Sequence, residues 1–185
     1  ILIPCTAKQP PPPVPPPTPP LPPRMSVPNQ NNYPFSISAD GKSLFVLYRK
    51  AANYDIAAMP MDGERQWKPL LNESHKEVYP RISPDGRWLA YTSNESGQYE
   101  VYVRPFPALD SGKWQVSTAG GDEPLWSPDG RELFYRGTGS DAGAVLAVTV
   151  EPESVFSPKA PRILFRGDYV LEASVNWDIS PDGKR

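Results

Sequence analysis

The side chains that carry out hydrolysis in serine enzymes are almost absent from this sequence. Its single histidine, His75, directly follows Ser74, and a Ser-His-Asp triad would have to use that histidine as its base. No serine lies in a Gly-x-Ser-x-Gly segment, the sharp turn that exposes the nucleophile of α/β-hydrolases. We therefore interpret His75 as a solvated loop residue between two structural units, and we expect no catalytic residues in this chain.

Two other patterns are typical of bound phosphate or metal, and neither is complete. The segment from Gly137 to Gly143 is rich in glycine like a phosphate-binding loop, but it lies between two expected strands and opens no helix. The His-Arg-Asp and Asp-Phe-Gly motifs that a kinase needs are missing. His75 and the single cysteine, Cys5, lie far apart and are too few for a zinc site of the usual four ligands. We expect no cofactor and no metal.

A short turn, Ser-x-Asp-Gly, recurs four times and is the most informative feature of the chain. Proline or alanine before the aspartate suits a type I turn, and the glycine can take the positive φ that leads into the next strand. Calcium binding is the alternative explanation, but each turn offers one carboxylate and lacks the downstream glutamate of an EF-hand. We predict a structural role for the repeated residues, which are Asp40 and Gly41, Asp85 and Gly86, Asp129 and Gly130, and Asp182 and Gly183.

The spacing of these turns predicts the fold. The four aspartates are 45, 44 and 53 residues apart, and a repeat of about 40–45 residues made of strands is typical of a β-propeller blade. Apolar residues alternate with polar ones as in strands, and no segment has the 3.6-residue period of a long helix. We expect an all-β partial β-propeller of four-stranded antiparallel blades. Three blades and the start of a fourth are expected at residues 33–72, 78–117, 123–165 and 175–185.

Residues 1–32 differ in composition from the rest and are expected to form a disordered linker. Residues 1–34 contain 14 of the 26 prolines, and such a segment favours extended polyproline II structure without a packed core. The segment from Pro19 to Arg24 fits a PxxP core followed by a cation, a ligand pattern for SH3 and WW domains; the alternative is a spacer. Because the chain starts at Ile1 rather than Met and stops just after a turn, we expect a fragment of a longer protein.

The charge and hydropathy of the chain restrict its partners. The 19 Lys and Arg residues are outnumbered by 21 Asp and Glu residues, which gives a net charge of −2. Nucleic-acid binding needs a basic patch, so we expect no nucleic-acid partner. No stretch approaches the roughly 20 apolar residues of a membrane-spanning helix. The remaining partners are a protein or a small ligand, and the sequence does not identify either.

Two long stretches share a pattern that resembles a known family. They are Tyr79–Tyr91, followed by Glu100–Val103, and Glu123–Tyr135. The pattern is similar to the WD-repeat-like blade of TolB and of prolyl-oligopeptidase-type peptidases. The stretch from Lys113 to Tyr135 also resembles propellers at the C-terminal end of bacterial eukaryotic-like serine/threonine protein kinases.

The resemblance implies a non-catalytic binding or sensing module of a larger bacterial protein, either a receptor-type kinase or a TolB-like protein. An extracytoplasmic location is favoured by the same resemblance. The alternative is the substrate-gating propeller of a serine peptidase. One fold hosts many functions, so the blade pattern by itself does not choose between them.

The interaction site is expected where the first strand of each blade begins, because that end of a propeller blade lies near the central channel. Tyr33, Tyr79 and Glu123 occupy this place in the three complete repeats, and we interpret them as equivalent. Most of the tryptophans are expected to pack between blades rather than to bind a ligand. This expectation applies above all to Trp88, Trp126 and Trp177, which lie next to the repeated turn.

Overall fold

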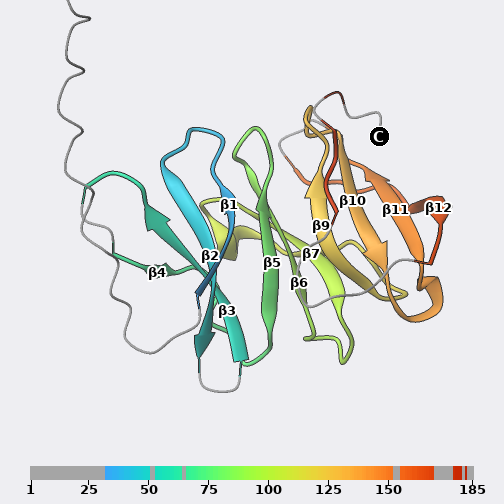
Figure 1. Cartoon of the computed structure of the whole chain (residues 1–185), viewed down its shortest axis with the longest axis horizontal. Coiled ribbons are helices and arrows are strands. Elements are labelled where there is room, and N and C mark those ends of the chain that lie inside the picture. Colours follow the sequence, from blue (N-terminus) through green and yellow to red (C-terminus); the bar gives the residue numbers. More distant parts are fainter. Residues whose placement is uncertain are drawn as a thin grey trace, which may run out of the picture.

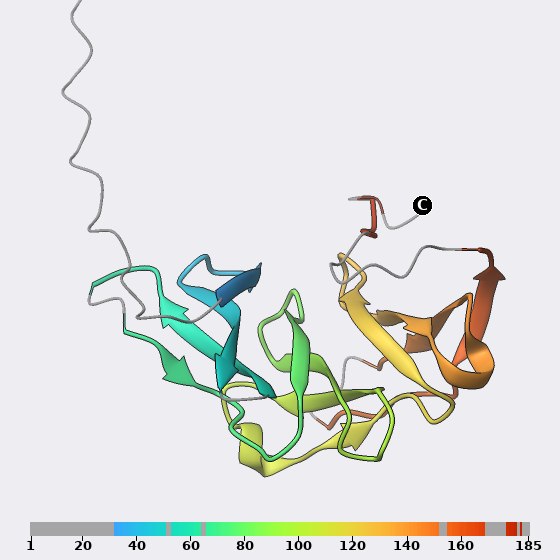
Figure 2. The same ribbon diagram turned by 60° about the horizontal axis from the view of Figure 1, so that its bottom comes forward.

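The computed structural model describes residues 32–50, 53–63, 66–151, 155–168, 177–180 and 182. These residues form an all-β structure with three four-stranded antiparallel sheets, which confirms the predicted partial β-propeller. In Figures 1 and 2 the three sheets stand side by side in chain order, as successive blades do. The expected linker, apart from Asn32, and most of the expected fourth blade lie outside the described residues.

Each sheet is built from four strands that follow one another in the sequence. The first sheet contains β1 (Asn32–Ile37), β2 (Ser43–Lys50), β3 (Asn53–Pro60) and β4 (Lys68–Pro69). The second contains β5 (Glu77–Ile82), β6 (Trp88–Ser93), β7 (Glu100–Pro105) and β8 (Trp114–Gln115). The third contains β9 (Gly121–Trp126), β10 (Glu132–Gly137), β11 (Ala144–Thr149) and β12 (Arg162–Arg166). The first strands β1, β5 and β9 contact one another in turn, so they form the inner side of the array.

Helical structure is confined to two short segments of the described chain, η1 (Leu109–Ser111) and η2 (Gly139–Asp141). No helix among the described residues is long and apolar enough to cross a membrane.

The repeated turn joins the first and second strands of each sheet through a small hydrogen-bond network. In the turn before β10, the Ser127 hydroxyl donates to the Asp129 carboxylate at 2.6 Å and accepts from the Glu132 N–H at 2.9 Å. The same carboxylate accepts the N–H of Arg131 at 3.1 Å. The glycine of this turn, Gly130, has a φ of +70°, close to +71° and +74° in the two earlier copies. In each of the first three turns, the aspartate accepts hydrogen bonds from the serine hydroxyl and from the backbone N–H two residues later.

The blades are held together by side chains of central strands that point alternately to the two neighbouring sheets. In β6, Trp88 and Ala90 belong to the apolar cluster shared with the third sheet, whereas Leu89 and Tyr91 belong to the cluster shared with the first sheet. Trp88 and Trp126 are buried, as the sequence predicts, and Phe156 completes their cluster with its ring 5.2 Å from that of Trp88. The register of such a strand is strongly specified, because a slip of one residue would turn each apolar set toward the wrong blade.

Candidate interaction site on the inner strands

Each inner strand carries a β-bulge at the same place in its sheet. The register shifts between Pro34 and Ser36 in β1, between Val78 and Arg81 in β5, and between Asp122 and Leu125 in β9. Each bulge contains or adjoins a proline, namely Pro34, Pro80 or Pro124. Proline has no N–H to donate to the ladder, so pairing is interrupted there and the neighbouring side chains are turned toward the inner side.

Two of these bulges hold a non-glycine residue in the left-handed region. Tyr79 has a φ of 56° and Glu123 a φ of 51°, and each directly precedes a proline. A bulky side chain rarely adopts this conformation, and a following proline favours an extended one. Such residues cost about 1–3 kcal/mol each and concentrate at ligand-binding positions. The structure thus gives Tyr79 and Glu123 the same unusual backbone, which supports their choice as candidate site residues.

The interpretation of Tyr33 as their equivalent is wrong in register. Tyr33 pairs with Leu47, and Leu47 lies seven residues after the turn aspartate Asp40. In the second and third sheets the residue seven after the aspartate pairs with Val78 and with Asp122, not with Tyr79 or Glu123. The first repeat has one additional residue, Phe35, between the proline and the turn, and this shifts the tyrosine outward by one position. The Tyr33 side chain is 44% exposed. Phe35 instead contacts Tyr79, with their ring centroids 5.6 Å apart.

Polar side chains beside these bulges connect the inner strands to one another and β9 to β10. Glu123 of β9 forms an ion pair with Arg136 of β10 at 3.2 Å, and both side chains are nearly inaccessible to solvent. Arg81 of β5 donates a hydrogen bond to the carbonyl of Phe35 in β1 and lies 6.0 Å from the centre of its ring. In the other direction, the indole N–H of Trp126 donates to the carbonyl of Arg81 at 3.1 Å. We call Tyr79, Arg81, Asp122, Glu123 and Arg136 the inner-strand cluster.

Burial shifts the titration of this cluster. It raises the pKa of Asp122 to about 6, and the charge of Glu123 adds to the shift. It raises the pKa of Tyr79 to about 12, with the charges of Asp122 and Glu123 as further causes. Burial also raises the pKa of Glu123, although Arg136 opposes this shift. The cluster therefore combines two acids whose pKa values are raised, two guanidinium groups and a phenol that is un-ionised at neutral pH, a set suited to hydrogen bonding rather than to nucleophilic attack.

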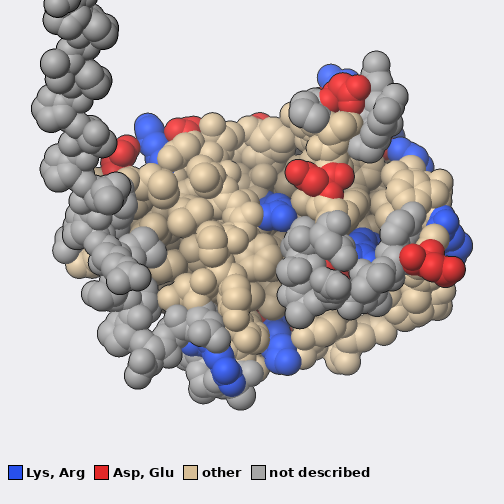
Figure 3. All heavy atoms as spheres, viewed as in Figure 1, with Lys and Arg blue, Asp and Glu red and all other residues tan. Residues whose placement is uncertain are grey.

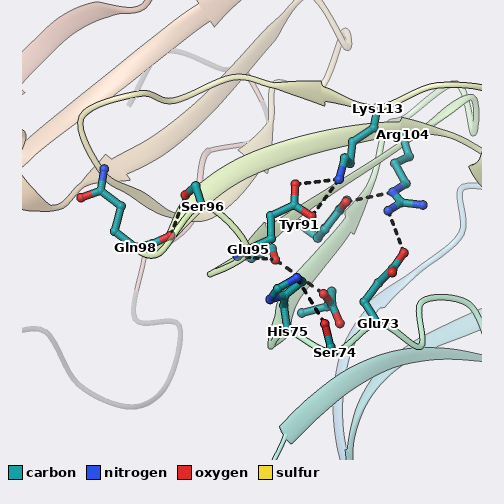
Figure 4. Close-up of polar contacts among 11 residues, drawn as sticks. Glu73, Ser74, His75, Tyr91, Glu95, Ser96, Gln98, Arg104 and Lys113 are labelled. Atoms are coloured by element: carbon teal, nitrogen blue, oxygen red, sulfur yellow. Dashed lines mark hydrogen bonds and ion pairs between the residues drawn. The ribbon is translucent and has the colours of Figure 1, made fainter.

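The residues considered first as catalytic candidates lie elsewhere. His75 is in the connection before β5, where its Nε2 is 3.3 Å from the Ser74 hydroxyl at an exposed site (Figure 4). The glycine-rich segment from Gly137 to Gly143 joins β10 to β11, as the sequence predicts, and forms η2 instead of the start of a long helix. With Arg136 and Asp168, its two end glycines line a cavity of about 280 Å³.

Sequence reasoning did not find three members of the cluster, namely Arg81, Asp122 and Arg136. A signal for Arg136 was present, because it ends the apolar run Leu133–Tyr135 inside a predicted strand. The ion pair of Arg136 with Glu123 depends on the bulge in β9, and the residues around Arg136 in the sequence do not predict that bulge. The face seen in Figure 3 shows Lys and Arg atoms at separate places among uncharged ones, without a continuous basic surface.

Comparison with known proteins supports the fold and only part of the function. No family model matches the chain. Tricorn protease homolog 1 of Streptomyces coelicolor is 35% identical over 88 residues, which are 44% of this chain and 8% of that protein. TolB from Acinetobacter baumannii has a similar structure, with a TM-score of 0.64 at 22% identity over 86% of this chain and 37% of TolB. The β-propeller domain of the Trilobed protease from Pyrococcus furiosus has a TM-score of 0.50 at 19% identity, over 74% and 43% of the two chains.

These similarities show a TolB-like β-propeller fold. The chain spans less than half of each of the three proteins, so their activities do not transfer to it by similarity alone. In the Trilobed protease the matched part is a β-propeller domain. The resemblance to kinase-associated propellers finds no support in these similarities and stays a prediction.

Proposed function

We propose that this chain is a non-catalytic module of a larger protein and that it binds a protein or a small ligand through the inner-strand cluster. The observation that carries the proposal is the left-handed backbone of Tyr79 and Glu123 at corresponding bulges. Strain of this kind persists only where the surrounding structure enforces it, and it presents side chains in directions that a regular strand does not allow. The TolB-like fold is consistent with this role.

The polar groups of the cluster indicate what such a ligand must offer. The Asp122 carboxylate is half-buried, and burial raises its pKa to about 6. A hydrogen-bond donor or a positive charge on a ligand would therefore stabilise the charged form of this carboxylate. Tyr79 and Phe35 add an edge-to-face aromatic pair that can cover an apolar group. A peptide carries N–H donors together with apolar side chains, and it is therefore the ligand class that we favour within this proposal.

A propeller that gates substrates of a serine peptidase is the second candidate. The sequence similarity to a tricorn protease homolog favours it. In that case the same inner side would admit peptides to a catalytic domain outside this chain. The two candidates differ in the parent protein rather than in the chemistry of the inner-strand cluster.

Selection of random peptides by phage display on the full chain tests the shared part of the proposal. Selected peptides should bind wild type and lose at least tenfold in affinity with Tyr79→Ala or Glu123→Gln. The matched control is Phe165→Ala, because Phe165 is an exposed aromatic in β12, the outer strand of the third sheet. Peptides that bind all three variants like wild type would place the binding surface elsewhere.

A further inference from the structure

A buried acid lies at or near the start of the third strand in each of the first two sheets. Asp55 in β3 pairs with Tyr48, and Glu100 in β7 pairs with Ser93. Tyr48 and Ser93 each lie eight residues after the aspartate of their own turn, so the two acids occupy the same position in successive blades. Asp55 is 0% exposed and Glu100 is 1% exposed. The two acids can therefore be compared as occupants of one site in two blade junctions.

Glu100 lies at the junction of the second and third blades, and its carboxylate has three hydrogen-bond donors. Its carboxylate accepts hydrogen bonds from the Ser117 hydroxyl, from the Gly120 N–H at 3.0 Å and from the Gln98 side chain at 2.6 Å. Two of these donors come from the segment that leads into β9, so the anion links the two blades. A buried carboxylate with several donors is stable in its charged form.

Asp55, at the junction of the first and second blades, has a different environment. Neither of its carboxylate oxygens has a hydrogen-bond partner among the described residues, and the same is true of Oε2 of Glu77. The other Glu77 oxygen accepts a long hydrogen bond from the Ser93 hydroxyl, at 3.5 Å. Glu77 is the first residue of β5 and is 1% exposed. Burial raises the pKa of Glu77, and Asp55 adds to this shift both as a hydrogen-bond partner and as a charge. Two carboxyl groups thus meet where the next junction has one carboxylate and its donors.

The third blade has no room for a second carboxyl group. Its residue at the position of Glu77 is Gly121, since Glu77 pairs with Ser93 and Gly121 with Gly137. A Cβ atom on Gly121 would lie 2.5 Å from the Ser117 hydroxyl. The carboxyl pair is therefore a specific feature of the first junction and not a general consequence of the blade repeat.

The nearby cations are occupied by other acids, as Figure 4 shows. Arg104 donates to the Glu73 carboxylate at 3.0 Å and to the Tyr91 hydroxyl at 2.9 Å. Lys113 donates to both oxygens of Glu95 at 2.7 Å. The charged and titratable groups around the pair are Tyr48 of β2, Glu73 and His75 of the connection before β5, Tyr91 of β6, Glu95 of the following turn, Arg104 of β7 and Lys113 before β8. Arg104 and Lys113 are thus each paired with an acid other than Asp55 or Glu77.

We propose that Asp55 and Glu77 share one proton, and that this proton locks the first blade onto the second. With the proton present, one carboxyl donates to the other across the junction. When it is lost, two negative charges are left close together in a buried site whose donors are the Ser93 hydroxyl, 3.5 Å from Glu77, and the Tyr48 hydroxyl beside Asp55. Two such groups cannot both ionise without a large free-energy cost. The junction between β3 and β5 then opens.

The direction of the pH dependence follows from the two states of Glu77. Burial and the neighbouring Asp55 raise its pKa from the ordinary 4.5 to about 8, and the step belongs to the pair rather than to one residue. Between these values the folded chain holds a proton that the unfolded chain has released. The stabilisation is therefore complete below about pH 4.5 and is lost as the pH rises toward 8. The equilibrium constant for opening rises by up to tenfold per pH unit in this window.

Opening would reach the inner-strand cluster because Tyr79 lies two residues after Glu77 in the same strand. The start of β5 would loosen together with the bulge that gives Tyr79 its backbone. This consequence is separate from the lock itself, which stands whether or not the cluster binds a ligand.

Amide hydrogen exchange of the full chain between pH 5 and 8, corrected for intrinsic exchange, tests the lock. The protection of β3 and β5 amides should fall by up to tenfold per pH unit in wild type, whereas β10 and β11 should show no such trend. Glu77→Gln should remove the trend, because its amide donates to Asp55 at every pH. Glu100→Gln, at the matching site of the next junction, and His75→Gln should keep it.

Three results would overturn the proposal. The first is an equal pH trend in wild type and Glu77→Gln, and the second is its disappearance in His75→Gln. The third is recovery of protection at pH 8 on addition of calcium or magnesium chloride, in wild type but not in Glu77→Gln, because it would show that the pair holds a cation. If Glu77→Gln does not fold, the ¹³C carboxyl titrations of Asp55 and Glu77 in wild type decide alone: the shared proton is refuted if neither carboxyl shows a step near pH 8.

Discussion

Replacing Arg136 by methionine would leave the Glu123 carboxylate buried without its counter-ion. The two side chains are only 6% and 4% exposed, and Nη1 of Arg136 lies 3.2 Å from the Glu123 carboxylate. Removing one partner of a buried ion pair costs about 3–5 kcal/mol because the remaining charge stays out of water. A domain of this size has a free energy of unfolding of about 5–15 kcal/mol, so the loss should be easily measured by urea denaturation at pH 8.

The cost of this substitution should depend on pH. Arg136 favours the charged forms of both Glu123 and Asp122, and burial already raises the pKa of each of these acids. Without the guanidinium group their pKa values rise further in the folded state, while the unfolded values stay at 4.5 and 3.8. The folded variant therefore binds protons that its unfolded chain has released, and it regains stability as the pH falls. The difference from wild type should be smaller at pH 5 than at pH 8.

A double variant separates charge from packing in this experiment. Arg136→Met combined with Glu123→Gln removes both charges while keeping the size of the acidic side chain, and it should recover most of the loss at pH 8. A single Arg136→Met variant within about 1 kcal/mol of wild type at pH 8 would contradict the argument, since exposed pairs contribute about 0–1 kcal/mol. A loss that grows at pH 5 would contradict the assigned direction of the pKa shifts.

Two further substitutions test the blade junction and the repeated turn. Gly121→Ala should destabilise the chain by about 1–3 kcal/mol through overpacking, because the new methyl group would lie 2.5 Å from the Ser117 hydroxyl; thermal denaturation measures it. Ser127→Ala removes a donor to the Asp129 carboxylate and should cost about 1 kcal/mol at pH 7. The Ser127 hydroxyl is the first cause that lowers the pKa of Asp129 below 3.8, so the stabilisation is present above that pH and is lost as the pH falls further.

Local patterns were sufficient to predict the central strands. The alternation of residues predicts a strand over 87–93, and β6 is Trp88–Ser93; it predicts 131–136, and β10 is Glu132–Gly137. The outer strands of the first two sheets are shorter than the pattern indicates, whereas that of the third, predicted over 162–165, is β12 (Arg162–Arg166). The prediction over 66–70 yields β4 with two residues, Lys68–Pro69, and that over 113–117 yields β8 with two, Trp114–Gln115. An outer strand has only one neighbour in the sheet, so fewer of its residues are held in the ladder.

The errors concern features that depend on pairing between distant segments. The register of Tyr33 changes because Phe35 is an additional residue, and only the pairing with β2 shows which residue is added. Phe156 lies in a connection that looks irregular in the sequence, yet it is buried against Trp88 and Trp114. The carboxyl pair of Asp55 and Glu77 joins two residues 22 positions apart in the chain. None of these contacts has a local pattern that could have predicted it.

The distribution of constant and variable residues among the three blades gives an independent reason to place binding on the inner strands. The turn keeps its serine, aspartate and glycine in every copy because its hydrogen bonds require them. The bulge keeps its place in the sheet, but its residues are Pro34 and Phe35, then Tyr79 and Pro80, then Glu123 and Pro124. A repeat that fixes the backbone and varies the side chains at one position offers an asymmetric surface on a regular frame. Bulges re-aim side chains, so these three sets of residues form an asymmetric surface of the kind that recognition of one particular ligand requires.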